Sequence, residues 1–107
     1  MSDSILVERA KRRKEIFRNL DKHLCGLKSF MLKLDENSKL YLFGSAARGG
    51  HSMISDVDVL IVTDLNPAEV IAQLWRAGFE EPFEFHVVGK EAAEKYFRII
   101  KNTLKPI

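Results

Sequence analysis

The sequence lacks several features, and each absence removes a class of protein. The 107 residues contain one cysteine, Cys25, so an internal disulfide is excluded. The chain has no apolar run long enough to span a bilayer, and it does not begin with the pattern of a secretory signal peptide. These absences predict a cytoplasmic protein that does not bind membranes.

The chain also lacks a strong excess of charge of either sign. Its formal net charge of +2 is too small to indicate nucleic-acid binding by itself. The charge is uneven, because residues 1–34 carry nine lysines and arginines against four carboxylates, and the remainder has an excess of three acidic residues. The basic run from Arg9 to Lys14 fits either the solvated face of a helix or a surface that contacts phosphodiesters or an acidic partner.

The length allows one small domain, which buries only about 60% of the surface that its unfolded chain exposes. We therefore predict a single domain over residues 1–107, with an N-terminal helical segment at 1–34 and a core at 39–107. The helical segment has apolar residues at alternating steps of three and four. They are Phe17, Leu20, Leu24, Leu27, Met31 and Leu34. A single helix of this length would be about 45 Å long, so we expect it to break near Cys25–Gly26 or to project and pair with another chain.

The rest of the chain predicts three strands and two further helices. Apolar runs at 39–43, 57–62 and 83–88 predict strands, the second of them central because both of its faces are apolar. Asn66 and Pro67 are typical of the start of a helix, which Gly78 would end, and a last helix is expected over 90–104. The order α-β-β-α-β-α favours an α+β class, or an α/β two-layer arrangement, with a small mixed sheet covered by helices on one face.

A Gly44-Ser45 turn follows the first predicted strand, and Asp56 and Asp58 come about ten residues later, at the start of the second. A helix beginning after such a turn would present free N–H groups and a positive dipole end to a phosphate. Side chains two residues apart on a strand point the same way, so the two carboxylates would share a face. Hard oxygen ligands suit Mg²⁺, which commonly bridges carboxylates and the phosphates of a substrate. Together the two halves predict one site for a nucleoside triphosphate.

This Gly-Ser and Asp-x-Asp pattern resembles the signature of the minimal nucleotidyltransferases of the DNA polymerase beta superfamily. The resemblance extends over about residues 39–88 and implies the nucleotidyltransferase fold. It implies that Gly44 and Ser45 bind the nucleotide phosphates, with Arg48 as a further nucleotide-binding residue, and that Asp56 and Asp58 hold one or two Mg²⁺ ions. Many relatives have arginine where this chain has Ala46, so one phosphate or partner contact is missing.

In these relatives a third carboxylate comes from a later strand, and Glu84 matches that position although aspartate is more usual there. If the strands at 57–62 and 83–88 lie side by side, Glu84 can point at the same metal ions as Asp56 and Asp58. His86 shares the face of Glu84 because the two are two residues apart. It would have a structural role, relay a proton or contact a phosphate. His51 is expected to be a solvated loop residue or a nucleotide contact.

The resemblance further implies an activity and a partner. Stand-alone members of this family are similar to antitoxins paired with an all-helical HEPN-domain protein, and the implied reaction moves AMP from ATP to a tyrosine hydroxyl of that partner. A chain this small would borrow surfaces from such a partner or from a second copy. Two alternatives remain: a binding module that neutralises its partner by occlusion, and an enzyme that modifies nucleic-acid ends.

Overall fold

The computed structural model describes residues 2–47, 56–100 and 103–107. Within these ranges the chain forms four helices and a four-stranded sheet. The predicted α+β class with a small mixed sheet is confirmed. The elements are α1 (Ser2–Arg18), α2 (Leu20–Leu34), β1 (Lys39–Phe43), β2 (Val57–Val62), α3 (Pro67–Arg76), β3 (Phe83–Val88), α4 (Lys90–Ile100) and β4 (Lys105–Pro106).

The sheet has the strand order β3-β2-β1-β4. β2 pairs antiparallel with β1 and parallel with β3, and the short β4, which we did not predict, pairs antiparallel with β1. β2 is central as expected, since five of its six residues are buried. Its position between two strands brings the second Asp-x-Asp aspartate next to residues from both neighbours.

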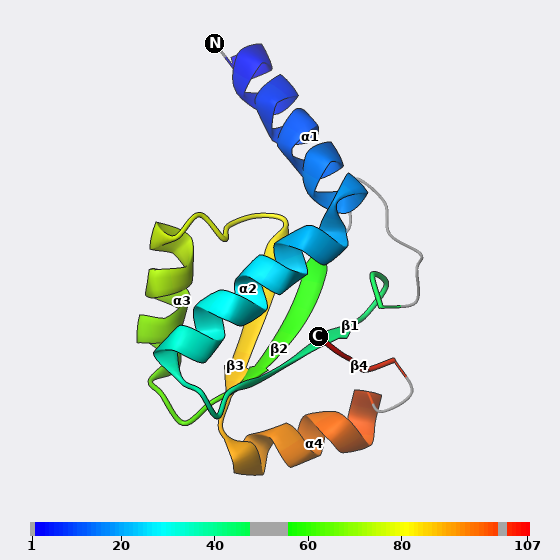
Figure 1. Cartoon of the computed structure of the whole chain (residues 1–107). Coiled ribbons are helices and arrows are strands. Elements are labelled where there is room, and N and C mark those ends of the chain that lie inside the picture. The colour runs from blue at the N-terminus through cyan, green and yellow to red at the C-terminus, as the bar shows by residue number, and fades with distance from the viewer. Residues whose placement is uncertain (1, 48–55, 101–102) are drawn as a thin grey trace.

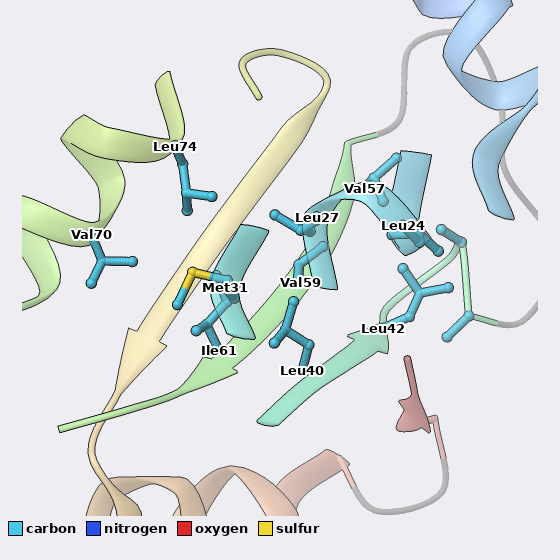
Figure 2. Packing of buried hydrophobic residues seen from close by; sticks show 12 residues of the cluster. Leu24, Leu27, Met31, Leu40, Leu42, Val57, Val59, Ile61, Val70 and Leu74 are labelled. Carbon is cyan, nitrogen blue, oxygen red and sulfur yellow. The ribbon is translucent and has the colours of Figure 1, made fainter. Parts of the chain in front are cut away.

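The main core lies between α2, α3 and one face of the sheet. Figure 2 shows side chains of α2 packed over those of β1 and β2, with the two α3 residues beside them. The labelled members are Leu24, Leu27, Met31, Leu40, Leu42, Val57, Val59, Ile61, Val70 and Leu74. The apolar stripe of α2 is therefore part of the domain core.

The opposite face of the sheet carries a second, smaller core made with α4. Leu60, Val62 and Ala93 are buried there, and Tyr41 and Phe97 pack against them. Helices therefore cover both faces of the sheet, whereas we expected them on one. Because side chains alternate along a strand, Asp58 belongs to this second face, two residues from Leu60.

The N-terminal helical segment breaks at Asn19, and the expected break near Cys25–Gly26 is wrong. Asn19 has φ −117° and ψ 37°, and its side-chain amide donates to the carbonyl of Glu15 at 3.3 Å. The side-chain amide thus shares the Glu15 carbonyl with the backbone N–H of Asn19, which donates to it at 3.0 Å, and asparagine side chains commonly bond the backbone in this way where a helix is interrupted. Gly26 lies inside α2.

Helix α1 projects from the body of the molecule beyond this break (Figure 1). Its first turns leave Ile5, Leu6 and Val7 between 52% and 61% exposed, whereas Ile16 is buried. Near its other end Arg12 donates to the carbonyl of Gly78 at 2.9 Å, and Arg13 pairs with Glu81 at 2.8 Å. Part of the basic run thus contacts the loop before β3. None of the helices in the described ranges is both long and apolar enough to cross a membrane.

Helix α3 begins and ends as the sequence predicted. The side-chain oxygen of Asn66 accepts from the backbone N–H of Glu69 at 3.2 Å, and Pro67 is the first helical residue. Gly78, just beyond the last helical turn, has φ +96°. These two signals depend on local chemistry alone, which is why they could be identified without knowing the fold.

The most direct test of this core is a pair of leucines on α2. Leu27 is fully buried and Leu32 is 41% exposed. Leu27→Ala leaves a cavity and should lower the free energy of unfolding by about 2–5 kcal/mol. Leu32→Ala should change it by only about 0.5 kcal/mol. Urea denaturation measures both, and equal losses would contradict this packing.

Asp35, after α2, is bonded to Thr63, after β2. The Thr63 hydroxyl donates to one Asp35 oxygen at 2.6 Å, and the N–H of Asn37 donates to the other at 3.0 Å. The Thr63 bond first, and then the Asn37 bond, lower the pKa of Asp35 below its usual value, outweighing the opposing effect of burial. Both bonds are made to the ionised form.

Asp35 should therefore make stability depend on pH in the acid range. Because its pKa is lowered in the folded state, its contribution is complete above the unfolded pKa of about 3.9 and is lost as pH falls through the folded pKa. Asp35→Asn should destabilise the protein at pH 7, and the difference from the wild type should shrink on acidification below about pH 4. Chemical denaturation at a series of pH values measures it, and a pH-independent difference would contradict the prediction.

Candidate active site

Asp58 lies on the central strand β2, so it has a pairing partner on each of the two neighbouring strands, β1 and β3. Asp58 is the pairing partner of Phe43 in β1 and of Glu84 in β3. β2 and β3 do lie side by side, which was the condition for Glu84 to reach the site, and Glu84 and Asp58 are direct neighbours across the parallel pair. Like charges at such positions repel unless a cation or a donor lies between them.

His86 joins these two carboxylates. Its Nε2 atom lies 3.4 Å from Oδ1 of Asp58 and 3.8 Å from Oε1 of Glu84. The ring packs edge-on against Phe43, with centroids 4.9 Å apart, and Tyr96 of α4 lies 6.2 Å away. The strand periodicity places His86 on the correct face of β3, but its distance from both carboxylates follows only from the register of β2 and β3.

Gly44, directly after β1, lies against Asp58. Its φ is +74°, a conformation that other residues adopt at a cost. A Cβ atom on Gly44 would lie 2.6 Å from Oδ2 of Asp58 and 3.5 Å from its Cγ. The glycine is therefore required both by the backbone conformation and by the close approach of the carboxylate. Gly44 and Asp58 form one unit, although 14 positions separate them in the sequence.

The residues after Gly44 form a turn. Ser45 is half-buried at its start, and Ala46 and Ala47 are 8% and 1% exposed within the main core. The alanine at position 46, where many relatives have arginine, thus packs in the core of this chain. The segment that follows this turn, residues 48–55, lies outside the described ranges, and with it Arg48 and His51, two of the residues considered for nucleotide binding.

Asp56 precedes β2 by one residue and is exposed. Val57 between the two aspartates is fully buried and its N–H donates to the carbonyl of Pro82 at 2.8 Å, which fixes the start of β2 against the chain entering β3. Among the described residues, the ligand atoms that cluster within 4.8 Å of one another belong to Asp58, Glu84 and His86. Asp56 is not in this cluster, although it is only two residues before Asp58 in the sequence.

The donor set fits a divalent cation. Carboxylate oxygens are ligands for Mg²⁺ and Mn²⁺, and imidazole nitrogen is a ligand for Mn²⁺ and the later transition metals. In the described part of the chain, Asp58 and Glu84 have no lysine or arginine partner, and their only ion pairs are with His86. Two adjacent carboxylates without a basic neighbour favour a bound cation at this position.

Comparisons with known proteins identify the family of the chain. A family model described as a nucleotidyltransferase domain matches residues 24–106. A crystal structure described as an inferred nucleotidyltransferase is 28% identical, with a TM-score of 0.65, over 79% of this chain and 97% of that chain. A second, described as an inferred nucleotidyltransferase from Sulfolobus solfataricus, is 19% identical with a TM-score of 0.43, over 83% and 78% of the two chains. No curated protein sequence matches the chain.

Proposed function

The chain belongs to the nucleotidyltransferase domain family, and from this premise we propose that it transfers a nucleoside monophosphate from a nucleoside triphosphate to an acceptor hydroxyl. The donor is ATP and the group transferred is AMP. The observation that carries the proposal is the pairing of Asp58 with Glu84 across β2 and β3, with His86 beside them and no lysine or arginine partner among the described residues. Such a set has no role in the core and suits a metal-bound polyphosphate.

Asp58 and Glu84 would hold the divalent cation, together with Asp56 from the start of β2. The bound cation would neutralise charge on the phosphates and lower the pKa of the attacking hydroxyl. Gly44 leaves room for Asp58 and lets the backbone approach the phosphates closely, while the Ser45 hydroxyl and the N–H groups of the turn are available as donors. The protein thus contributes positioning and charge stabilisation.

The reaction forms one bond and breaks another. The acceptor oxygen attacks the α-phosphorus, the bond from that phosphorus to the bridging oxygen breaks, and pyrophosphate leaves with the electron pair of that bond. The hydroxyl proton passes to water. Arg48, which matches an arginine of the family signature, would contact the phosphate oxygens.

We further propose that the acceptor is a tyrosine hydroxyl on a HEPN-domain protein, for which this chain acts as the antitoxin. Exposed apolar side chains at the projecting end of α1 support a protein partner, since Ile5, Leu6 and Val7 are each more than half exposed (Figure 1). A partner would supply acceptor-binding surface that a domain of 107 residues has little room for.

Labelling tests this proposal. The purified protein is incubated with Mg²⁺ or Mn²⁺ and each of the four nucleoside triphosphates labelled at the α-phosphate, with and without the product of the adjacent gene. We expect covalent label from ATP on the partner. Neutralisation of the partner without any label, unchanged after loss of both Asp56 and Asp58, would instead establish binding by occlusion.

The same reactions test nucleic acid as the acceptor. Arg12 and Arg13 already bind the loop before β3, which leaves fewer free cations on α1 for a phosphodiester chain. Label on the ends of added RNA or DNA, with binding that weakens steeply as salt rises, would show that the acceptor is a nucleic acid and not a protein.

A further inference from the structure

We propose that His86 is a nitrogen ligand of the catalytic cation, and that it makes the site select Mn²⁺ over Mg²⁺. This inference rests on the proposed function, because it concerns the cation held by Asp58 and Glu84. It assigns a role to a residue that the Gly-Ser and Asp-x-Asp pattern does not include.

The distances between the donor atoms suit one shared ion. Two ligands about 2.1 Å from an ion are about 3.0 Å apart at adjacent octahedral positions and about 3.4 Å apart in a tetrahedron. Nε2 of His86 lies 3.4 Å from Asp58 Oδ1 and 3.8 Å from Glu84 Oε1. Side-chain shifts of a few tenths of an ångström would therefore bring all three atoms to bonding distance.

The imidazole is held in place by packing. Phe43 and Tyr96 flank the ring, and Phe43 comes from the strand on the far side of β2. The side chain is 26% exposed, so one part faces solvent and the rest is enclosed. A ligand whose orientation is fixed before the ion binds loses little conformational entropy on binding.

Nε2 makes one hydrogen bond, a long one of 3.4 Å to Oδ1 of Asp58, and a still longer contact of 3.8 Å to Oε1 of Glu84. N–H···O bonds in proteins have donor–acceptor distances of about 2.7–3.2 Å, and both distances from Nε2 exceed that range. His23 on α2 provides the contrast, because its Nε2 lies 3.0 Å from Oε2 of Glu15. Aromatic packing holds the His86 ring, and its Nε2 faces both carboxylates while making only one long hydrogen bond, to Asp58.

A nitrogen ligand changes which cation is preferred. Mg²⁺ binds oxygen and keeps several waters, whereas imidazole binds readily to transition-metal ions, and affinity for such sites rises from Mn²⁺ through the later metals. A site of two carboxylates and one imidazole should therefore bind Mn²⁺ more tightly than Mg²⁺, and much of that difference should depend on His86.

Electron paramagnetic resonance of Mn²⁺ tests this without measuring transfer. Titration of the free-ion signal gives the Mn²⁺ affinity, competition gives the Mg²⁺ affinity, and electron spin-echo modulation detects a coordinated ¹⁴N nucleus. The wild type should show imidazole ¹⁴N modulation. His86→Asn should lose it and weaken Mn²⁺ binding about tenfold or more, with Mg²⁺ binding changed by less than about threefold. His23→Asn, which changes a histidine of α2 that pairs with Glu15, should retain both the modulation and the affinity.

Three results would overturn the inference. They are wild-type protein without ¹⁴N modulation, equal weakening of both metals in His86→Asn, and tighter Mn²⁺ binding in that variant, which would mean that His86 competes with the ion for the carboxylates. If the His86→Asn variant fails to fold, the presence or absence of ¹⁴N modulation in the wild-type spectrum still tests whether a nitrogen atom coordinates the ion. Nitrogen-coordinated Mn²⁺ in a protein that transfers no nucleotide would refute the proposed function alone, and transfer without nitrogen coordination would refute this inference alone.

Discussion

Gly44→Ala should lower nucleotidyl transfer by about 100-fold or more. The added Cβ would lie 2.6 Å from Oδ2 of Asp58, and the easiest relief is rotation of the Asp58 side chain away from Glu84 and His86. Misplacing a catalytic group by about 1 Å can cost about 100-fold in rate. The rate of α-label transfer and the Mn²⁺ affinity measure the loss, and both should fall.

Gly78→Ala is the matched control. Gly78 also has a positive φ, +96°, but a Cβ there would meet nothing within 4 Å. Each alanine should lower the free energy of unfolding by about 1–2 kcal/mol, the cost of a left-handed conformation. Only Gly44→Ala should lose transfer. If both variants keep wild-type transfer, or if both lose it in proportion to stability, the contact between Gly44 and Asp58 has no catalytic role.

Asp58→Asn should abolish transfer without weakening the fold. Losing a charged metal ligand removes several kcal/mol of stabilisation of the transition state, and about 4 kcal/mol corresponds to a rate about 1,000-fold lower. Asp58 is in direct register with Glu84, so removing its charge also relieves repulsion across the strand pair. The free energy of unfolding should stay equal or rise by up to about 1 kcal/mol.

This separation of activity from stability can be checked on one preparation. Transfer of α-label gives the activity, and urea denaturation without divalent cations gives the stability. An Asp58→Asn protein that transfers at the wild-type rate would refute the assignment of the site. A protein that loses several kcal/mol of stability would show instead that Asp58 serves the fold.

The sequence predicted those parts of the structure that depend on local pattern. The period-two face of β3 placed Glu84 with His86 and opposite Phe85, and the apolar run of β2 marked it as central. Helix α3 has the expected Asn66 cap. In each case residues a few positions apart determine the outcome, so no tertiary information was needed.

The parts that the sequence did not reveal depend on distant contacts. The N-terminal segment breaks at Asn19, whose side chain bonds Glu15, whereas the more obvious signal, Gly26, stays helical. The second core under α4 follows from the aromatic residues of β1, which a short strand pattern does not assign to a face. Ala46 is buried through contacts that its neighbours in sequence do not specify.

The candidate site likewise has residues that the sequence identified and residues whose role emerged only from the fold. Asp58 and Glu84 were predicted because the motif and the strand periodicity both identify them. The role that we infer for His86 needed the register of β2 and β3, because only that pairing brings its Nε2 near both carboxylates. Gly44 was predicted as a phosphate contact, and its close approach to the Asp58 carboxylate emerged from the fold.

The fate of each phosphate tests the central claim most directly. Parallel reactions would use ATP labelled at the α-phosphate and ATP labelled at the γ-phosphate, with the divalent cation, this protein and its acceptor. Nucleotidyl transfer predicts α-label on the acceptor and an equal amount of γ-label in pyrophosphate, both lost in Asp58→Asn. Label from the γ-phosphate on the acceptor, or α-label released only as free AMP, would contradict the account.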